Sequence, residues 1–454
     1  MKILVWNSPF ISQGNIFFFK NCFIKTLIPQ ANTLCKAGHN VDVIITDSTV
    51  DAVEFLDVRA KKIFISGEDV FEMLDGMYDP NSNFYKNDQF KFNKISNVLY
   101  KKLNNHYDAI LLWETPVPFL EKMYPEALIA HQMPGVFCRP PYPHLITFDV
   151  TGLYKKGTIY NSWKDIVTYD THHGTAYEFI NICYSIFSKL NVFSDKIDKA
   201  RSKYHKIHLL PLQVSAHYAF GVDSGYHSQT ELLFDVSRTI PRDEGIFVTQ
   251  YITPNTSDKI LSGPVVRLLN SRYSNIIYDP LFNEIDSVSQ YLVPFVDGII
   301  SVSSSLLFQS MLWNKNIKVF TDSFMSPYAD ENIFSSKLDI KKAHTNTINF
   351  FIDKHQVLAS KLEEPIFMTR FLEELVEKKK KGKTGIDTFC CFSDIDDNYS
   401  ENLLNSFRYN RSRKSLKSFF PKVIEKDIQL DKIDKNIKNN DFEIISFDIF
   451  DTLI

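Results

Sequence analysis

Short apolar runs alternate with longer amphipathic segments along the first 320 residues. The amphipathic segments, such as 20–36 and 230–239, place apolar residues at the spacing of one helix face. The apolar runs are short and rich in Ile, Val and Leu, which predicts buried strands. They are Lys2–Trp6, Val41–Thr46, Lys61–Ile65, Asp108–Trp113, Leu128–His131, His208–Val214, Gly245–Gln250, Asn275–Tyr278, Gly298–Ile300 and Ile317–Phe320. Strands that alternate with helices predict an α/β fold with parallel sheets.

The alternation falls into two groups, which predicts two Rossmann-like domains facing a cleft. The first turn lacks the GxGxxG pattern, so dinucleotide binding is disfavoured. Amphipathic helices are expected after the second group, at about 341–354 and 357–380. The predicted units are an N-terminal domain (1–204), a second domain (205–345), C-terminal helices (346–385), a linker with helical extension (386–440) and a terminal segment (441–454).

Polar residues follow the predicted strands of the second domain. Because parallel strands end at one edge of a sheet, these residues are expected to meet where open α/β sheets bind ligands. They are Gln213, Gln250, Asp279 and Ser303–Ser305. The sequence therefore predicts a ligand crevice at that edge.

The stretch Gly298–Phe320 reads as strand, three serines, helix and strand. Ser303–Ser305 fall where the helix must begin, and unpaired N–H groups there suit an anion such as a phosphate. The alternative is that one serine is an N-cap and the others are loop residues. The other strand-end polar residues favour the anion.

The segment Gln132–Tyr154 combines several prolines with Arg139, Asp149 and Tyr154. Rigid residues around a few charged groups indicate a positioned loop. A proline-rich crossover in which Asp149 caps a turn is the alternative interpretation.

Bulk composition narrows the function classes. The chain of 454 residues has a net charge of −3 and a pI near 6.5, which does not call for nucleic acid. Its six cysteines show no CxxC spacing, which favours reduced thiols in a cytoplasmic protein over a zinc site. No apolar window is long enough for a membrane span, and the N-terminus lacks the apolar core of a signal peptide.

The segment 408–422 is basic, has no acidic residue and carries Leu416, Phe419 and Phe420. It could contact an anionic membrane surface from the cytoplasmic side, or be a solvated linker helix.

Three stretches resemble motifs of the bacterial capsule-polysaccharide biosynthesis glycosyltransferases, in particular the retaining β-Kdo transferases, which use CMP-Kdo. The first combines Gly135–Arg139 with Asp149–Tyr154. The second is Pro211–Val214, and the third is Ser303–Lys315. The resemblance implies a GT-B-like architecture, with the nucleotide held mainly by the second domain.

Two departures from that family fall near the expected donor pocket. Thr249–Pro254 stands where the family usually has Lys-Pro-His-Pro, and Gln309 stands where it tends to have Glu. Because of their position, these departures bear on which donor sugar and which nucleotide the protein binds.

The chain's last residues, FEIISFDIFDTLI, resemble the first motif of the haloacid-dehalogenase (HAD) superfamily. Asp448 would be the strand-end nucleophile, and Phe450 stands where phosphatases of that superfamily carry a second carboxylate. We expect 441–454 to be the truncated start of a HAD-like domain.

The expected function is metal-independent transfer of a sugar, Kdo or a related acidic sugar, to a growing capsule or lipopolysaccharide chain. Asp149 is predicted to act as base or nucleophile, and Arg139 to hold an acidic sugar or a phosphate. The predicted donor-binding residues are Gln213, Gln250, Ser303, Ser304, Ser305 and Gln309. Three histidines are possible acids or bases, namely His172, His173 and His217.

The expected partners are a nucleotide-sugar donor and an oligosaccharide or lipid-linked acceptor. Two other functions stay open. One is a polyol-phosphate transferase of teichoic-acid type, which shares the architecture. The other is a non-catalytic scaffold for the HAD-like domain.

Overall fold

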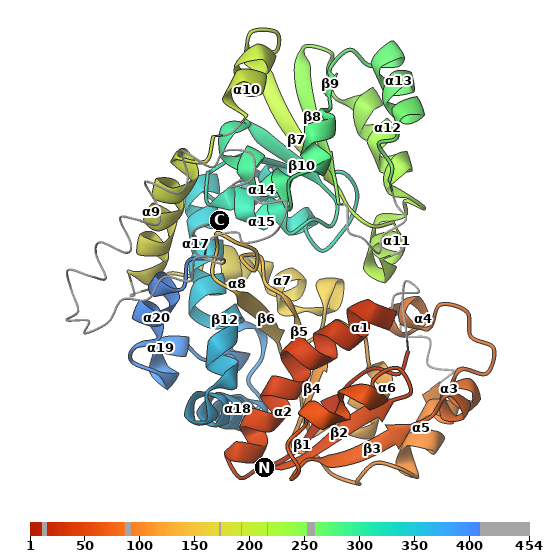
Figure 1. Ribbon diagram of the computed structural model, residues 1–454. Coiled ribbons are helices and arrows are strands. Elements are labelled where there is room, and N and C mark those ends of the chain that lie inside the picture. The colour runs from red at the N-terminus through yellow and green to blue at the C-terminus, as the bar shows by residue number, and fades with distance from the viewer. Residues whose placement is uncertain are drawn as a thin grey trace, which may run out of the picture.

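The computed structural model describes residues 1–10, 16–86, 92–171, 174–191, 193–215, 217–251 and 259–408 (Figure 1). The predicted HAD-like start, the basic segment beyond Arg408, and His172 and His173 lie outside these residues. Figure 1 shows two sheets, one in each half of the molecule, with helices α9 and α17 beside their junction. The α/β fold with two Rossmann-like domains is confirmed.

The first sheet has seven strands in the order β12-β6-β5-β4-β1-β2-β3. Its parallel part, β3-β2-β1-β4-β5, has the strand order of a Rossmann half. The strands are β1 (Lys2–Trp6), β2 (Asn40–Thr46), β3 (Lys61–Ile65), β4 (Ala109–Trp113), β5 (Leu128–Pro134), β6 (Leu145–Asp149) and β12 (Gln356–Leu358).

Helices cover both faces of this sheet. Helix α2 shows why such helices form, because its buried face carries Ile28, Ala31 and Leu34 at a spacing of three residues. The helix ends before Gly38, whose backbone φ of +85° suits a helix C-terminus. Helix α2 spans Ile28–Lys36. The other helices of this part of the chain are α1 (Ile16–Cys22), α3 (Gly67–Leu74), α4 (Pro80–Lys86), α5 (Phe92–Tyr100), α6 (Pro118–Met123), α7 (Thr158–Asn161), α8 (Trp163–Val167) and α9 (Thr175–Ser188). Helix α10 (Ser194–Arg201) follows and contacts strand β7 (Lys206–Leu212) of the second sheet.

The second sheet has five strands, all parallel, in the order β11-β10-β7-β8-β9. This order is again that of a Rossmann half, with its reversal between β7 and β10. The strands are β7 (Lys206–Leu212), β8 (Glu244–Gln250), β9 (Ile276–Ile277), β10 (Gly298–Ser301) and β11 (Asn316–Val319). Its helices are α11 (Tyr218–Ser224), α12 (Gln229–Thr239), α13 (Gly263–Arg272), α14 (Val288–Leu292), α15 (Leu306–Met311) and α16 (Asp330–Ser335).

After the second sheet, the chain returns to the first. Helix α17 (Ile340–Phe350) leads to β12, which pairs antiparallel with β6, and α18 (Pro365–Lys380) then packs against α2. The short helices α19 (Phe392–Ile395) and α20 (Tyr399–Asn405) follow. The C-terminal helices therefore cover the first domain, while the predicted domain boundaries stay predictions.

Two local predictions were wrong. The segment Gln132–Tyr154 is not all loop, because Leu145–Asp149 forms strand β6. The helix expected at 357–380 begins only at Pro365, because Val357 and Leu358 belong to β12. Both strands are short. The partner of β12 is β6, which is distant in sequence, and β6 is separated from its other partner, β5, by a proline-rich loop, so pairing rather than local pattern decides both strands.

A continuous hydrophobic core joins the two domains. Phe187 of α9 lies 5.5 Å from the Trp313 ring and 5.9 Å from the Tyr291 ring of the second domain. A shared apolar interface of this kind restrains relative domain motion.

All six cysteines are free thiols, and burial raises the pKa of the Cys390 thiol to about 12. No helix among the described residues is long and apolar enough to cross a membrane.

Gly135→Ala is expected to destabilise the protein by about 1–3 kcal/mol, because a new methyl group must displace backbone atoms. A Cβ at Gly135 would lie 2.7 Å from the Leu145 carbonyl oxygen, across the β5–β6 junction. Gly221→Ala in α11 is the control, since a Cβ there meets nothing within 4 Å. Thermal unfolding checks both variants, and equal melting temperatures would contradict the expectation.

Candidate active site at the strand ends

Two of the predicted donor residues meet where the strand order of the second sheet reverses. Gln213 follows β7 and Ser303 follows β10, and the Ser303 hydroxyl donates to the Gln213 Oε1 at 2.9 Å. Both side chains are partly exposed. Open α/β sheets bind ligands outside the carboxyl ends of strands at this reversal point. The pair therefore lies at the position where this fold places a ligand.

The other serines of the turn have different surroundings. Ser304 is buried, and its N–H donates to the Ser301 hydroxyl at 3.0 Å. Ser305 is the residue before α15 and forms no side-chain cap. Because α15 has only six residues, its dipole is small, and the anion prediction depends on the partly exposed hydroxyls of Ser303 and Ser305.

Gln250 and Asp279 hold neighbouring chain segments. The Gln250 amide accepts from the Leu261 N–H at 2.8 Å and donates to Asn283 at 3.1 Å. Asp279 forms an ion pair with Lys196. Burial acts to raise the pKa of the Asp279 carboxyl, but Lys196 and the Leu281 N–H outweigh it and hold the pKa below its ordinary value.

Gln309 connects the second domain to the first. Its side-chain amide donates to the Val136 carbonyl at 2.7 Å, and its buried Oε1 has no hydrogen-bond partner among the described residues. Val136 belongs to the loop that carries Arg139. The predicted donor residue therefore contacts the opposite domain directly.

Arg139 also lies at the junction of the domains. Its guanidinium is 4.9 Å from the centre of the Tyr251 ring and donates to the Ser287 hydroxyl at 3.2 Å. The residue is exposed and has no carboxylate partner among the described residues. An arginine that is exposed and without an acidic partner can bind a carboxylate or phosphate of a ligand.

Asp149 is the last residue of β6, and its side chain is buried. Its Oδ1 accepts from the Thr151 N–H at 2.8 Å and from the Thr151 hydroxyl at 2.7 Å, with Thr158 Oγ1 at 3.2 Å. Its Oδ2 accepts from the Thr158 N–H at 2.9 Å and from His355 Nε2 at 3.2 Å. These contacts occupy the lone pairs of an ionised carboxylate.

These donors also determine the charge state of Asp149. Burial acts to raise the pKa of its carboxyl, but the His355 hydrogen bond and the Thr151 donors outweigh it, so the pKa lies below its ordinary value. The sequence placed Asp149 in a cleft-side loop, whereas the structure places it at the end of an antiparallel strand. Its predicted catalytic role stays a prediction.

A second carboxylate lies at the strand ends of the first sheet. Glu114 directly follows β4, and its Oε1 lies 3.6 Å from His217 Nε2 of the second domain. The Tyr154 hydroxyl donates to Glu114 Oε1 at 3.3 Å and lies 3.0 Å from His217 Nε2. The side chains of Glu114 and His217 are 18% and 23% exposed, so solvent or a ligand can reach both.

The backbone at this cluster is strained. Glu114 has a backbone φ of +44° and Tyr154 a backbone φ of +53°, values that residues other than glycine rarely adopt. Strain of this kind persists only where the surrounding structure enforces it, and it concentrates at functional sites. Burial and the Glu114 charge raise the pKa of Tyr154, so its hydroxyl stays a donor.

Glu114 directly follows the predicted strand Asp108–Trp113 but is not among the residues predicted for the site. The available signal was its position, because a carboxylate directly after a buried strand satisfies the rule that selected Gln213. His217 was selected as a possible acid or base, and Tyr154 as part of a motif. Only the fold shows that the three residues meet.

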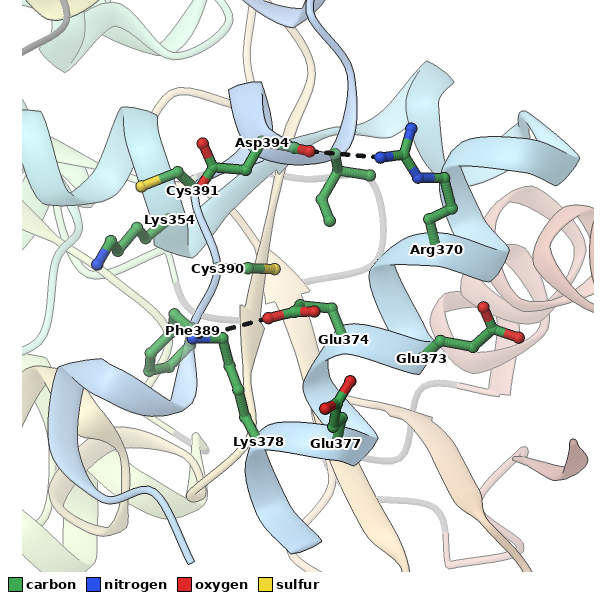
Figure 2. A pocket seen from close by; sticks show the side chains of 11 residues that line it. Lys354, Arg370, Glu373, Glu374, Glu377, Lys378, Phe389, Cys390, Cys391 and Asp394 are labelled. Atoms are coloured by element: carbon green, nitrogen blue, oxygen red, sulfur yellow. Dashed lines mark hydrogen bonds and ion pairs between the residues drawn. The ribbon is translucent and has the colours of Figure 1, made fainter. Parts of the chain in front are cut away.

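Figure 2 shows a separate pocket of about 430 Å³ beside α18, lined by charged residues of both signs and by Cys390 and Cys391. Glu374 lies 3.9 Å from Lys378, and Arg370 donates to the Asp394 carbonyl at 3.5 Å. None of the predicted site residues lines this pocket.

Among the described residues, no group of three or more His, Cys, Asp or Glu could hold a metal ion.

No protein-family model and no curated protein sequence matches this chain. Several solved structures have a similar fold, and three of them follow. The β-Kdo 2,7 transferase KpsC of Thermosulfurimonas dismutans is 13% identical, with 61% of this chain and 90% of that chain aligned and a TM-score of 0.35. The Neisseria meningitidis UDP-GlcNAc 2-epimerase bound to UDP-GlcNAc is 12% identical over 89% and 99%, with a TM-score of 0.30. The spinosyn rhamnosyltransferase SpnG is 10% identical over 90% and 95%, with a TM-score of 0.29.

Similarities with TM-scores this low carry no functional argument. The class of the protein follows from its own topology: two Rossmann-like sheets, each with reversed strand order, and a C-terminal segment that returns to the first domain. This is a two-domain α/β protein of GT-B-like architecture.

Proposed function

We propose that this protein is a glycosyltransferase that takes a sugar from a nucleotide-sugar donor and adds it to a growing bacterial surface polysaccharide. The observation that carries the proposal is a contact between the strand-end regions of the two sheets. Gln213 and Ser303 lie at the reversal point of the second sheet, and His217, which also follows β7, contacts Glu114 of the first sheet. One bound donor could therefore contact both domains.

The groups at this junction match what sugar transfer needs. The leaving phosphate requires hydrogen-bond donors, and the acceptor hydroxyl requires a base. The Ser305 hydroxyl supplies a donor, the Ser303 hydroxyl supplies a second when it turns from Gln213 Oε1 to the phosphate, and the Glu114–His217 pair can take and return a proton. We propose these roles, with Asp149 as the buried carboxylate that shapes the turn from 149 to 158.

Kdo or a related acidic sugar is the donor sugar that we propose. Arg139 supports this choice, because its exposed guanidinium has no acidic partner among the described residues and lies at the domain junction. A guanidinium binds a carboxylate through two parallel hydrogen bonds. A neutral sugar would leave that charge without a partner of its own.

Thermal-shift measurements with nucleotides and nucleotide sugars test the proposal. CMP, UDP and their sugar conjugates at 100 times their Kd are expected to stabilise the protein by about 2.7 kcal/mol, because they bind the folded state only. Adenosine monophosphate serves as the mismatched nucleotide control. No response to any cytidine or uridine compound would favour the scaffold function.

The polyol-phosphate transferase is distinguished by its product. Sugar transfer leaves the phosphate on the nucleotide, whereas polyol-phosphate transfer adds phosphorus to the acceptor. Mass spectrometry of the acceptor separates the two reactions once a donor is found. A phosphorus-containing product would replace the proposed reaction by the alternative one.

A further inference from the structure

The loop between β5 and β6, residues 135–144, is here called the Arg139 loop. Three of its residues are prolines, Pro140, Pro141 and Pro143, which have no N–H group. The loop therefore has few donors to pair with its own carbonyl groups. Carbonyl groups that are buried without a partner cost free energy, so donors must come from elsewhere.

The second domain supplies donors on one side of this loop. Gln309 donates to the Val136 carbonyl at 2.7 Å. Gln290 donates to the Pro140 carbonyl at 2.5 Å, and the Tyr291 hydroxyl donates to the same oxygen at 3.3 Å. The loop thus belongs to the first domain by sequence and is held by the second.

A single arginine supplies the donors on the other side. Arg408 donates from its guanidinium to the Cys138 carbonyl at 2.5 Å and to the Tyr142 carbonyl at 3.1 Å. Its backbone N–H donates to the Pro141 carbonyl at 2.8 Å. The forked guanidinium can bond two carbonyl groups at once, which a lysine ammonium on a flexible stem does less well.

The position of Arg408 is fixed by the packing of the residues before it. The Tyr399 hydroxyl of α20 accepts from the Leu358 N–H of β12 at 2.8 Å. The Phe407 ring lies 5.1 Å from Phe179, which lies 5.2 Å from Phe137 of the Arg139 loop. Arg408 has no carboxylate partner among the described residues, so its bonds to the loop are its main polar contacts.

We propose that Arg408 is a positioning residue that holds Arg139 in the place where it binds the donor's anionic group. The proposal deepens the proposed function and rests on it for the identity of that group. Arg139 lies between Cys138 and Pro140, whose carbonyl groups are held by Arg408 and by Gln290. Arg408 itself does not contact the ligand. The C-terminal segment 399–408 is thereby part of the site.

Hydrogen exchange of the full chain tests the first half of this inference. In Arg408→Ala, the amides of 136–145 are expected to exchange at least tenfold faster than in the wild type, and Arg408→Lys to lie between the two. Arg370→Ala is the matched control, because the Arg370 guanidinium also donates to a backbone carbonyl, that of Asp394, but does not bond to the loop. Unchanged exchange in 136–145 would overturn the inference.

A double-variant cycle with Arg139→Ala tests the second half, with CMP-sugar and UDP-sugar conjugates as probes. If Arg408 acts through Arg139, the double variant binds the probe no more weakly than Arg139→Ala alone. Losses that multiply would show a separate effect and overturn the positioning role. If the wild type binds no probe, the proposed function fails, while exchange in 136–145 still decides whether Arg408 holds the loop.

Discussion

Glu114→Gln is expected to lower the rate of sugar transfer by roughly 100- to 10,000-fold, the usual loss when a general acid or base is removed. The amide keeps the size of the side chain but cannot take a proton from an acceptor hydroxyl. It also leaves His217 without the carboxylate 3.6 Å away. Initial rates with the donor identified by thermal shift measure the effect.

The chain offers a matched control for this substitution. Glu121 of α6 lies 3.6 Å from His131 of β5, the same separation, and no side-chain hydrogen bond or ion pair among the described residues joins this pair to Glu114, His217 or Tyr154. Glu121→Gln is expected to keep the wild-type rate. If both variants transfer sugar equally well, Glu114 is not the acid–base group.

Asp149→Asn is expected to lower the free energy of unfolding by about 3 kcal/mol, because buried donors that now bond to the carboxylate lose part of their acceptor capacity. The new amide group would face donors from Thr151, Thr158 and His355, which need an acceptor. Denaturant unfolding measures the loss. Asp51→Asn is the control, because its ion pair with Lys20 is exposed to solvent and contributes little to stability.

The contribution of Asp149 to the free energy of unfolding is expected to decrease in acid. Its folded pKa lies below the unfolded value of about 3.9, so the stabilisation is present above that pH and is lost as pH falls through the folded pKa. The difference in the free energy of unfolding between wild type and Asp149→Asn is therefore expected to narrow in acid.

An Asp149→Asn protein that is as stable as the wild type but has no transferase activity would instead support the catalytic role predicted from sequence.

Most elements of the fold could be predicted, because their signals are local. Buried strands such as β1 and β4 are apolar throughout, and α2 shows helical spacing and a terminal glycine. The two strands that were missed, β6 and β12, pair with each other across more than 200 residues. No local pattern reports such a pairing, because the hydrogen bonds that stabilise it are made by distant residues.

The candidate site was predictable only in part. Gln213 and Ser303 were selected because strand ends share an edge, and the structure brings them within a hydrogen bond. The same rule did not place Asp149, because β6 runs antiparallel to its neighbour and carries its last residue away from that edge. Arg139 was selected from a motif, but its contact with Tyr251 crosses the domain junction.

By itself, the sequence determined the α/β class, the repeated strand–helix order and the polar residues after the strands, because these depend on periodicity and on short-range backbone preferences. Only the tertiary structure decided which of those residues meet. Glu114 with His217, Asp149 with His355, and Arg408 with the Arg139 loop are separated by 103, 206 and about 270 residues. Such contacts arise from the packing of two domains and a returning C-terminal segment, which no short stretch of sequence encodes.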